Sequence, residues 1–213
     1  MSRQAIRVIG ITGPTGAGKS LLSDYLRRQG IAVIDADAVY HELLVPPSAC
    51  LDALRQAFGD GIFFADGTLD RSALSAIVFH DADKLTLLNQ TVLGFVLSEI
   101  RRRIGLLAED SHTVVAVDAP TLIESGFHAE CDSVVSVLAP AELRLSRIMQ
   151  RDGIDRTAAL ARIRAQKDDS FYRSHSDTVL NNDGDRERFF ACCEPVVAWA
   201  RAQSKPLCLS KKG

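Results

Sequence analysis

One stretch constrains the fold of this chain more than any other, and its sequence is Gly-Pro-Thr-Gly-Ala-Gly-Lys-Ser at residues 13–20. It fits the pattern of Gly, any four residues and Gly-Lys-Ser, which is typical of a loop that cradles phosphate groups. Residues 6–11 are mostly apolar and predict a short buried strand, and residues 21–28 predict a helix. Glycines let backbone N–H groups turn inward, and the helix N-terminus adds partial positive charge. We therefore expect an anion site at this loop, with Lys19 on the terminal phosphates of a nucleotide and the Ser20 hydroxyl on Mg²⁺.

The composition narrows the class of protein. A length of 213 residues with 46% hydrophobic residues suits one domain with a sizeable core. The net charge of -2 gives no indication of a nucleic-acid or membrane partner. No apolar run has the length of a membrane span, and the N-terminal residues lead directly into the first strand, so we expect no signal peptide. The five cysteines form no CxxC pair, which predicts reduced thiols and a cytoplasmic location.

Two carboxylates follow the second predicted strand, which covers residues 31–34 and ends in Asp35-Ala36-Asp37. Carboxylates at the carboxyl end of such a strand face the ligand crevice of an α/β sheet. Strand alternation predicts that Asp35 and Asp37 point the same way. One would contact the water shell of a metal, and the other would accept a proton. Alternatively, one or both cap a helix that starts near Ala38.

A long segment between the second and third strands has little β signal and predicts helices over residues 48–58, 70–79 and 81–107. It is too long for a simple crossover. In a phosphotransferase, such an insert is the natural place to hold the acceptor. Arg71 falls in the first turn of its helix, where a cation opposes the helix dipole, so it either binds an anion or is an ordinary surface arginine.

The third predicted strand, 113–118, ends in Asp118, and the fourth covers residues 133–138. An apolar strand that ends in aspartate is typical of a carboxylate placed near Mg²⁺, and a strand-end cap is the alternative. We expect Asp118 to act on the metal through water.

After the fourth strand, a helix opened by Pro140 carries Arg144, Arg147 and Arg151, the last two on one face. A second charged helix is predicted over residues 155–166. The pair resembles the lid of a nucleotide kinase, in which an arginine stabilises charge on the transferring phosphoryl group. The alternative is an exposed helical face without function.

The rest of the chain predicts a fifth strand at 177–180, a polar turn at 181–184, a last helix from 185 to about 202 and a short edge strand at 207–209. The alternation of strands and helices predicts a three-layer α/β P-loop kinase fold with a five-stranded parallel sheet. We predict a single domain whose core is 1–38, 112–146 and 176–213. The acceptor-binding helical insert is about 39–111, and the helical lid is about 147–175.

Taken together, these motifs resemble those of the dephospho-CoA kinase family, and the resemblance extends from Val8 to about Gly184. The order and spacing of seven blocks carry the resemblance: residues 13–20, 30–37, 58–59, 66–71, 120–124, 147–152 and 181–184. It implies transfer of the γ-phosphate of ATP to the ribose 3′-hydroxyl of dephospho-CoA, with Mg²⁺, in a monomer or weak homo-oligomer. The alternatives are another P-loop nucleoside or nucleotide kinase, or a non-catalytic nucleotide-binding regulator.

The resemblance also implies residue roles. Asp37 is the base, Arg147 is the lid arginine with Arg151 beside it, and the helical insert binds the acceptor. Asp35, like Asp118, would reach the metal through water. The residues implied to bind ATP lie directly before, in and after the loop, on the first lid helix, and in the 181–184 turn beside the adenine: Thr12, Gly13, Thr15, Gly16, Ala17, Gly18, Lys19, Ser20, Leu21, Arg151 and Asn182.

Two blocks differ from the usual pattern of the family. The usual His-Pro pair after Asn89 is here Leu93-Gly94, and the usual Pro-Leu-Leu reads Pro120-Thr121-Leu122. Both lie on the acceptor side or its support, so they leave the expected ATP site unchanged.

Overall fold

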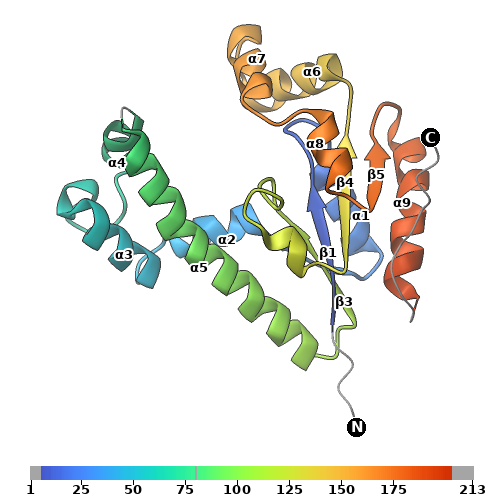
Figure 1. The fold of residues 1–213 in the computed structure, drawn as a ribbon, viewed down its shortest axis with the longest axis horizontal. Helices are drawn as coiled ribbons and strands as arrows, with labels where there is room; N and C mark the ends of the chain where they lie inside the picture. The colour runs from blue at the N-terminus through green and yellow to red at the C-terminus, as the bar shows by residue number, and fades with distance from the viewer. Residues whose placement is uncertain (1–5, 80, 203–213) are drawn as a thin grey trace. The chain divides into compact units, whose positions relative to one another are not determined.

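The computed structural model describes residues 6–79 and 81–202, and the predicted strand at 207–209 lies outside these residues (Figure 1). The strands are β1 (Arg7–Thr12), β2 (Ala32–Asp35), β3 (Val114–Asp118), β4 (Ser133–Leu138) and β5 (Thr178–Asn181). The α-helices are α1 (Lys19–Arg28), α2 (Ala36–Leu43), α3 (Ala49–Phe58), α4 (Arg71–Phe79), α5 (Ala82–Glu109), α6 (Ala141–Asp152), α7 (Arg156–Arg164), α8 (Asp169–Ser174) and α9 (Arg186–Arg201). Two short 3₁₀ helices are η1 (Asp60–Ile62) and η2 (Phe127–Glu130).

The strands form one sheet in the order β2-β3-β1-β4-β5. β1 pairs in parallel with β3 on one side and β4 on the other, and β4 pairs in parallel with β5. The predicted five-stranded parallel sheet is therefore confirmed. Because β1 is the central strand, the loop that follows it begins in the middle of the carboxyl edge.

Helices cover both faces of the sheet, as its nearly continuous apolar strands require. On one face α1 and α9 pack on alternate strand residues, with Leu26, Phe189 and Val197 almost fully buried against Val135 and Val137. On the other face, Tyr172 of α8 packs on Leu138 and Ile123. The result is a three-layer α/β arrangement in this part of the chain.

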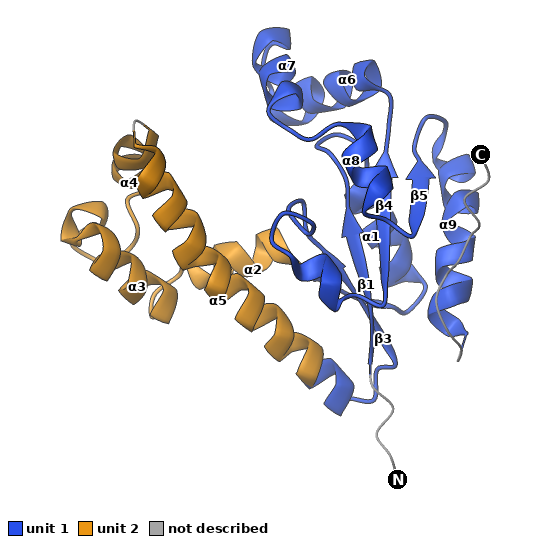
Figure 2. Ribbon diagram, viewed as in Figure 1, with its two compact units in different colours: residues 1–34, 106–213 blue, residues 35–105 orange. Residues whose placement is uncertain are grey.

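The chain divides into two compact units (Figure 2). Unit 1 is residues 1–34 and 106–213, and it holds the sheet, α1 and α6–α9. Within it, α6 and α7 share a small apolar core formed by Leu145, Ile148 and Ala159. The second half of α6 and all of α7 fall within the segment predicted as the lid, about 147–175, whereas α6 begins earlier, at Ala141.

Unit 2 is residues 35–105 and is helical. α3, η1 and α4 form a compact corner in which Arg55 stacks 4.3 Å from the centre of the Phe63 ring. A single antiparallel bridge joins Phe63 to Leu69 beside the Asp66-Gly67 turn. The three helices predicted in this segment all form, and Ser48, Asp70 and Asp81 each accept a backbone N–H of the following turn. Among the described residues, no helix combines the length and apolarity that a membrane crossing needs.

Candidate active site

The loop at residues 13–20 has the predicted setting, since β1 ends at Thr12 and α1 begins at Lys19. Gly18 is the N-cap residue of α1 and has a φ of 105°, a conformation that glycine alone adopts without strain. A Cβ on Gly18 would lie 2.1 Å from Nδ2 of Asn182. The loop therefore needs glycine here both for its backbone conformation and for space.

Lys19 and Ser20 occupy the first turn of α1. Lys19 Nζ donates to the carbonyl of Gly13 at 2.8 Å, so the ammonium group lies over the loop. Ser20 is exposed, and Leu21 donates its backbone N–H to the Gly18 carbonyl at 3.0 Å. This arrangement leaves the Ser20 hydroxyl accessible to a ligand at the helix N-terminus.

Arg147, which lies on α6, contacts the phosphate loop with its guanidinium group. Its Nη1 donates to the carbonyls of Gly16 and Ala17 at 3.2 and 3.3 Å, and its Nη2 lies 3.3 Å from Oδ1 of Asn182. Burial lowers the pKa of Arg147, and a guanidinium nevertheless keeps its proton. The predicted lid arginine thus contacts the backbone of the loop.

Arg151 makes a different contact from Arg147, although the two share a helical face. Its side chain is 62% exposed and pairs with Asp152, with Nε 2.7 Å from Oδ1. Asp152 also pairs with Arg162 of α7. The structure therefore places Arg151 in an ion-pair cluster that joins α6 to α7.

Asn182 is almost fully buried just after β5. Its Nδ2 donates to the Ala17 carbonyl at 2.8 Å, and its own N–H donates to Leu138 at 2.7 Å. The polar turn that was predicted beside the nucleotide base therefore contacts the phosphate loop through the Asn182 side chain.

Two further predicted residues lie at the carboxyl edge of the sheet. Thr12 is fully buried, and its Oγ1 donates to the Pro120 carbonyl at 3.3 Å. Asp118 is also buried, and its Oδ2 accepts a hydrogen bond from Ser23 of α1 at 2.6 Å. Asp118 is therefore held beside the helix that starts with Lys19 and Ser20, a contact that the sequence did not indicate.

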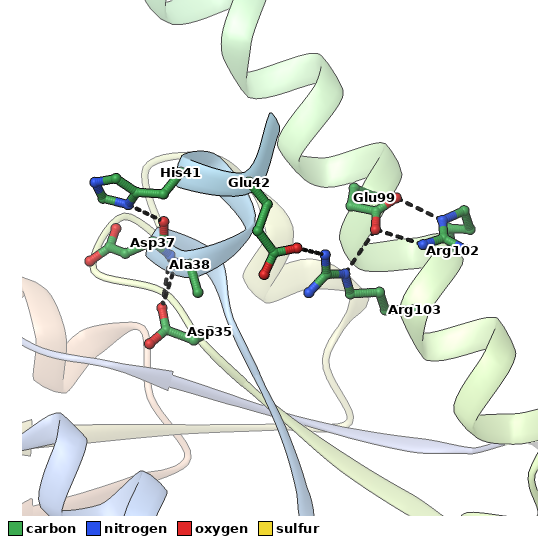
Figure 3. Close-up of polar contacts among 8 residues, drawn as sticks. All are labelled: Asp35, Asp37, Ala38, His41, Glu42, Glu99, Arg102 and Arg103. Carbon is green, nitrogen blue, oxygen red and sulfur yellow. Dashed lines mark hydrogen bonds and ion pairs between the residues drawn. The ribbon is translucent and has the colours of Figure 1, made fainter. Parts of the chain in front are cut away.

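Asp35 and Asp37 require a correction. The predicted strand alternation is wrong, because β2 ends at Asp35 and Asp37 is already in the first turn of α2 (Figure 3). Asp35 is the N-cap, and its Oδ1 accepts the N–H groups of Asp37 and Ala38 at 2.9 and 3.1 Å. The capping alternative for Asp35 is confirmed, whereas Asp37 is exposed on the helix surface.

Other side chains of α2 form one contact within the helix and one with α5. His41 Nδ1 donates to the Asp37 carbonyl at 2.6 Å. On the opposite side of α2, Glu42 pairs with Arg103 of α5, which also bonds Glu99 at 2.8 Å (Figure 3). Hydrogen bonds from arginine lower the pKa of Glu99 to about 2.

Two further residues contact the loop, and the sequence did not indicate either contact. Arg144 is buried, and its Nε donates to the Thr15 carbonyl at 2.9 Å. Gln166 follows α7, and its Oε1 accepts the Thr15 N–H at 2.9 Å. Arg144 is four residues before the fully buried Ile148, so helical spacing could have placed it on the inner face. No pattern in the sequence marks Gln166.

Within unit 1, oxygen donors suited to Mg²⁺ are present, namely the exposed Ser20 hydroxyl and the carboxylate of Asp118. Across residues 6–79 and 81–202, no cluster of three or more His, Cys, Asp or Glu side chains could hold a metal without other ligands. These donors fit an ion that keeps several waters and binds together with substrate phosphates, as Mg²⁺ usually does.

The sheet is parallel with the order 2-3-1-4-5, a Gly-Lys-Ser loop follows its central strand, and Arg147 of α6 contacts that loop. These features together define a P-loop kinase. A family model described as dephospho-CoA kinase matches residues 7–187. The chain belongs to the dephospho-CoA kinase family and is an ATP-dependent phosphotransferase.

Individual relatives agree with this assignment. The dephospho-CoA kinase of Leifsonia xyli subsp. xyli is 38% identical over 92% of this chain and 100% of its own length. That of Symbiobacterium thermophilum is 36% identical over 92% and 82%. Among solved structures, dephospho-CoA kinase from Campylobacter jejuni has a TM-score of 0.67 at 25% identity, over 90% of this chain and 95% of the other. TT1252 from Thermus thermophilus has a TM-score of 0.77 at 31% identity, over 91% and 97%.

Proposed function

We propose that this kinase transfers the γ-phosphate of ATP to the ribose 3′-hydroxyl of dephospho-CoA, which gives coenzyme A and ADP. The family assignment, over residues 7–187, is the observation that carries the acceptor. The phosphate loop and the arginines that contact it are the observations that support ATP as the phosphate donor.

In this proposal the triphosphate binds at the loop of unit 1. The residues that contact it are Thr12, Gly13, Thr15, Gly16, Ala17, Gly18, Lys19, Ser20 and Leu21. Lys19 exchanges its contact with the Gly13 carbonyl for the β- and γ-phosphates, because an ammonium group binds phosphate more strongly than a neutral carbonyl. Asn182 supports the loop at Ala17 and lies beside the adenine.

Mg²⁺ would be held by the Ser20 hydroxyl, with Asp118 and Asp35 acting through water. When bound, the ion neutralises part of the phosphate charge. Asp118 suits this role, because its hydrogen bond with Ser23 fixes the carboxylate beside α1. Asp35 has one oxygen in the cap of α2, and its other oxygen carries the water-mediated role.

Asp37 is the proposed base: it orients the acceptor hydroxyl and receives its proton as the phosphoryl group transfers. Its exposed position leaves the carboxylate open to a substrate. Arg147, together with Arg151, stabilises charge on the transferring group and excludes water. The helical insert, about 39–111, binds the rest of the acceptor.

An assay of ADP release tests the function directly. Purified enzyme with Mg-ATP is offered dephospho-CoA, AMP or adenosine, and the product is located by ³¹P NMR. We expect turnover with dephospho-CoA only and a new phosphate on the ribose 3′-oxygen. Turnover with AMP or adenosine and none with dephospho-CoA would show a different kinase of the same fold. ATP binding without acceptor-dependent turnover would show a non-catalytic regulator.

The proposal also covers the state of the protein, which we take to be a monomer or weak homo-oligomer in the cytoplasm. The four cysteines within the described residues, Cys50, Cys131, Cys192 and Cys193, are free thiols, as a reducing compartment favours. Analytical ultracentrifugation over a range of concentrations measures the assembly state. A tight oligomer at the lowest concentration would contradict it.

A further inference from the structure

Five consecutive carbonyls of the phosphate loop accept hydrogen bonds from side chains. Their donors are Lys19 for Gly13 and Pro14, Arg144 for Thr15, Arg147 for Gly16, and Arg147 with Asn182 for Ala17. Three of these donors come from outside the loop, on α6 and after β5. The loop conformation therefore depends on distant side chains as well as on its own glycines.

Thr15 is held by both of its backbone groups. Its carbonyl accepts from Arg144 Nε at 2.9 Å, and its N–H donates to Gln166 Oε1 at 2.9 Å. Arg144 Nη2 also lies 3.3 Å from the same Gln166 oxygen. The three residues close a ring of hydrogen bonds, which we call the Thr15 clamp.

The burial of Arg144 makes this contact a specific one. Only 5% of the residue is exposed, and desolvation lowers the pKa of its guanidinium. A buried cation is destabilising unless hydrogen bonds replace its water. The hydrogen bonds from Arg144 to Thr15 and Gln166 supply that replacement. Both hydrogen bonds hold the nearly buried guanidinium against the loop and the residue that follows α7.

The glycine at position 16 shows how closely α6 approaches the loop. A Cβ on Gly16, which has a φ of 76°, would lie 2.8 Å from the Arg144 carbonyl oxygen and 3.1 Å from its Cα. The backbone of the loop therefore packs directly on the backbone of α6 at Arg144. This contact and the Thr15 clamp fix the same peptide units.

We propose that Arg144 and Gln166 are positioning residues of the ATP site, which act on phosphate binding through the backbone of Thr15. In a trans peptide unit the C=O and the following N–H point in opposite directions. Holding the Thr15 carbonyl toward Arg144 thus turns the Gly16 N–H away from α6, to the side available for phosphate. This inference rests on the proposed ATP site at the loop.

The test compares Gln166→Met, which keeps side-chain length but loses the acceptor, with Gln166→Glu, which keeps an acceptor for Thr15 and Arg144. We expect Gln166→Met to raise the KM for ATP about tenfold, since a hydrogen bond to a charged group contributes about that factor. The kcat at saturating ATP and the KM for dephospho-CoA should stay near wild type. Gln166→Glu should keep the KM for ATP within about twofold of wild type.

Gln150→Met is the matched control, because Gln150 is an exposed glutamine on α6 outside the clamp. Arg144→Lys, which keeps the charge but not the two-point geometry, should raise the KM for ATP in the same direction as Gln166→Met. An unchanged KM for ATP in Gln166→Met, with active wild-type enzyme, would overturn the inference and leave the proposed function standing. Inactive wild-type enzyme would overturn the proposed function itself.

Binding by calorimetry separates positioning from a general structural role. Positioning predicts that Gln166→Met weakens ATP and ADP binding while adenosine, measured by competition, binds as it does to wild type. Equal weakening of adenosine and ATP would show that the substitution damages the whole site, and would overturn the inference.

Discussion

Asp37 makes its hydrogen bonds through its backbone, so its side chain can be changed without loss of the helix. Its N–H bonds Asp35 Oδ1 at 2.9 Å, and its carbonyl accepts from His41 at 2.6 Å. Asp37→Asn keeps the shape and removes the base. We expect kcat to fall by roughly a hundredfold or more, with the KM for ATP and the melting temperature nearly unchanged.

Asp52→Asn is the control for Asp37→Asn, because Asp52 is an exposed aspartate in the first turn of α3. Steady-state kinetics on both variants, with ATP and dephospho-CoA varied separately, measures the effect. Turnover near wild type in Asp37→Asn would show that Asp37 is not the base.

At this scale the sequence predicted residues with a strong local pattern and missed those that act through space. The glycines, Lys19 and Ser20 follow from one motif. Arg144 and Gln166 are 129 and 151 positions from Thr15, and their role depends on how α6 and the end of α7 fold onto the loop. The side-chain direction of Asp37 was mispredicted because α2 begins at Ala36, two residues before the predicted start near Ala38.

Among the elements, α5 is unusual, because it runs for 28 residues and includes Gly94. A Cβ on Gly94 would meet nothing within 4 Å. Because alanine loses less backbone entropy than glycine in a helix, we expect Gly94→Ala to raise the free energy of unfolding by about 0.5–1 kcal/mol. Urea denaturation measures this change.

Gly30→Ala provides the contrast to Gly94→Ala. A Cβ there also meets nothing, but Gly30 has a φ of 80°, so alanine would be strained and destabilising. Equal effects of the two substitutions would contradict the role given to backbone conformation.

α5 also carries a carboxylate whose stabilising effect depends on pH. Hydrogen bonds from Arg102 and then Arg103 lower the pKa of Glu99 from 4.5 to about 2 in the folded protein. The folded state therefore binds the proton less tightly than the unfolded state, and stability from Glu99 is present above about pH 4.5. It should decline as the pH falls from 4.5 through 2.

The difference in free energy of unfolding between wild type and Glu99→Gln measures this effect. We expect a constant difference from pH 7 to pH 5 that shrinks at lower pH. Glu109→Gln, at an exposed position of the same helix, is the control. A difference that did not change between pH 5 and pH 3 would show that the ion pairs of Glu99 do not stabilise the fold.

For the whole molecule, we expect nucleotide binding to raise the free energy of unfolding. A ligand that binds only the folded state at 100 times its Kd adds about 2.7 kcal/mol to the free energy of unfolding. We expect Mg-ATP to raise the melting temperature by several degrees, and ATP with EDTA to raise it less. Mg²⁺ alone should have little effect, because the donors present suit an ion bound together with phosphates. An equal shift with and without EDTA would contradict the magnesium proposal.

The overall architecture was largely predictable from the alternation of strands and helices, because a parallel sheet needs a crossover between its strands. The strand order was not, since neighbours such as β1 and β3 are chosen by packing over long distances in the sequence. Short elements were not predicted, because they too depend on packing. For example, α8 has six residues and is stabilised by the packing of Tyr172 on Leu138 and Ile123.

The central place of β1 has a consequence for synthesis of the chain. A ribosome completes β1 well before β3 and β4, the two strands that pair with it, and the helical unit, 35–105, emerges in between as one continuous segment. We expect this segment to fold first. Until β3 and β4 are made, both edges of β1 remain unpaired, and an unpaired strand edge can pair with another chain. Arg144, Gln166 and Asn182 arrive later still, so nucleotide can stabilise the nascent protein only near the end of translation.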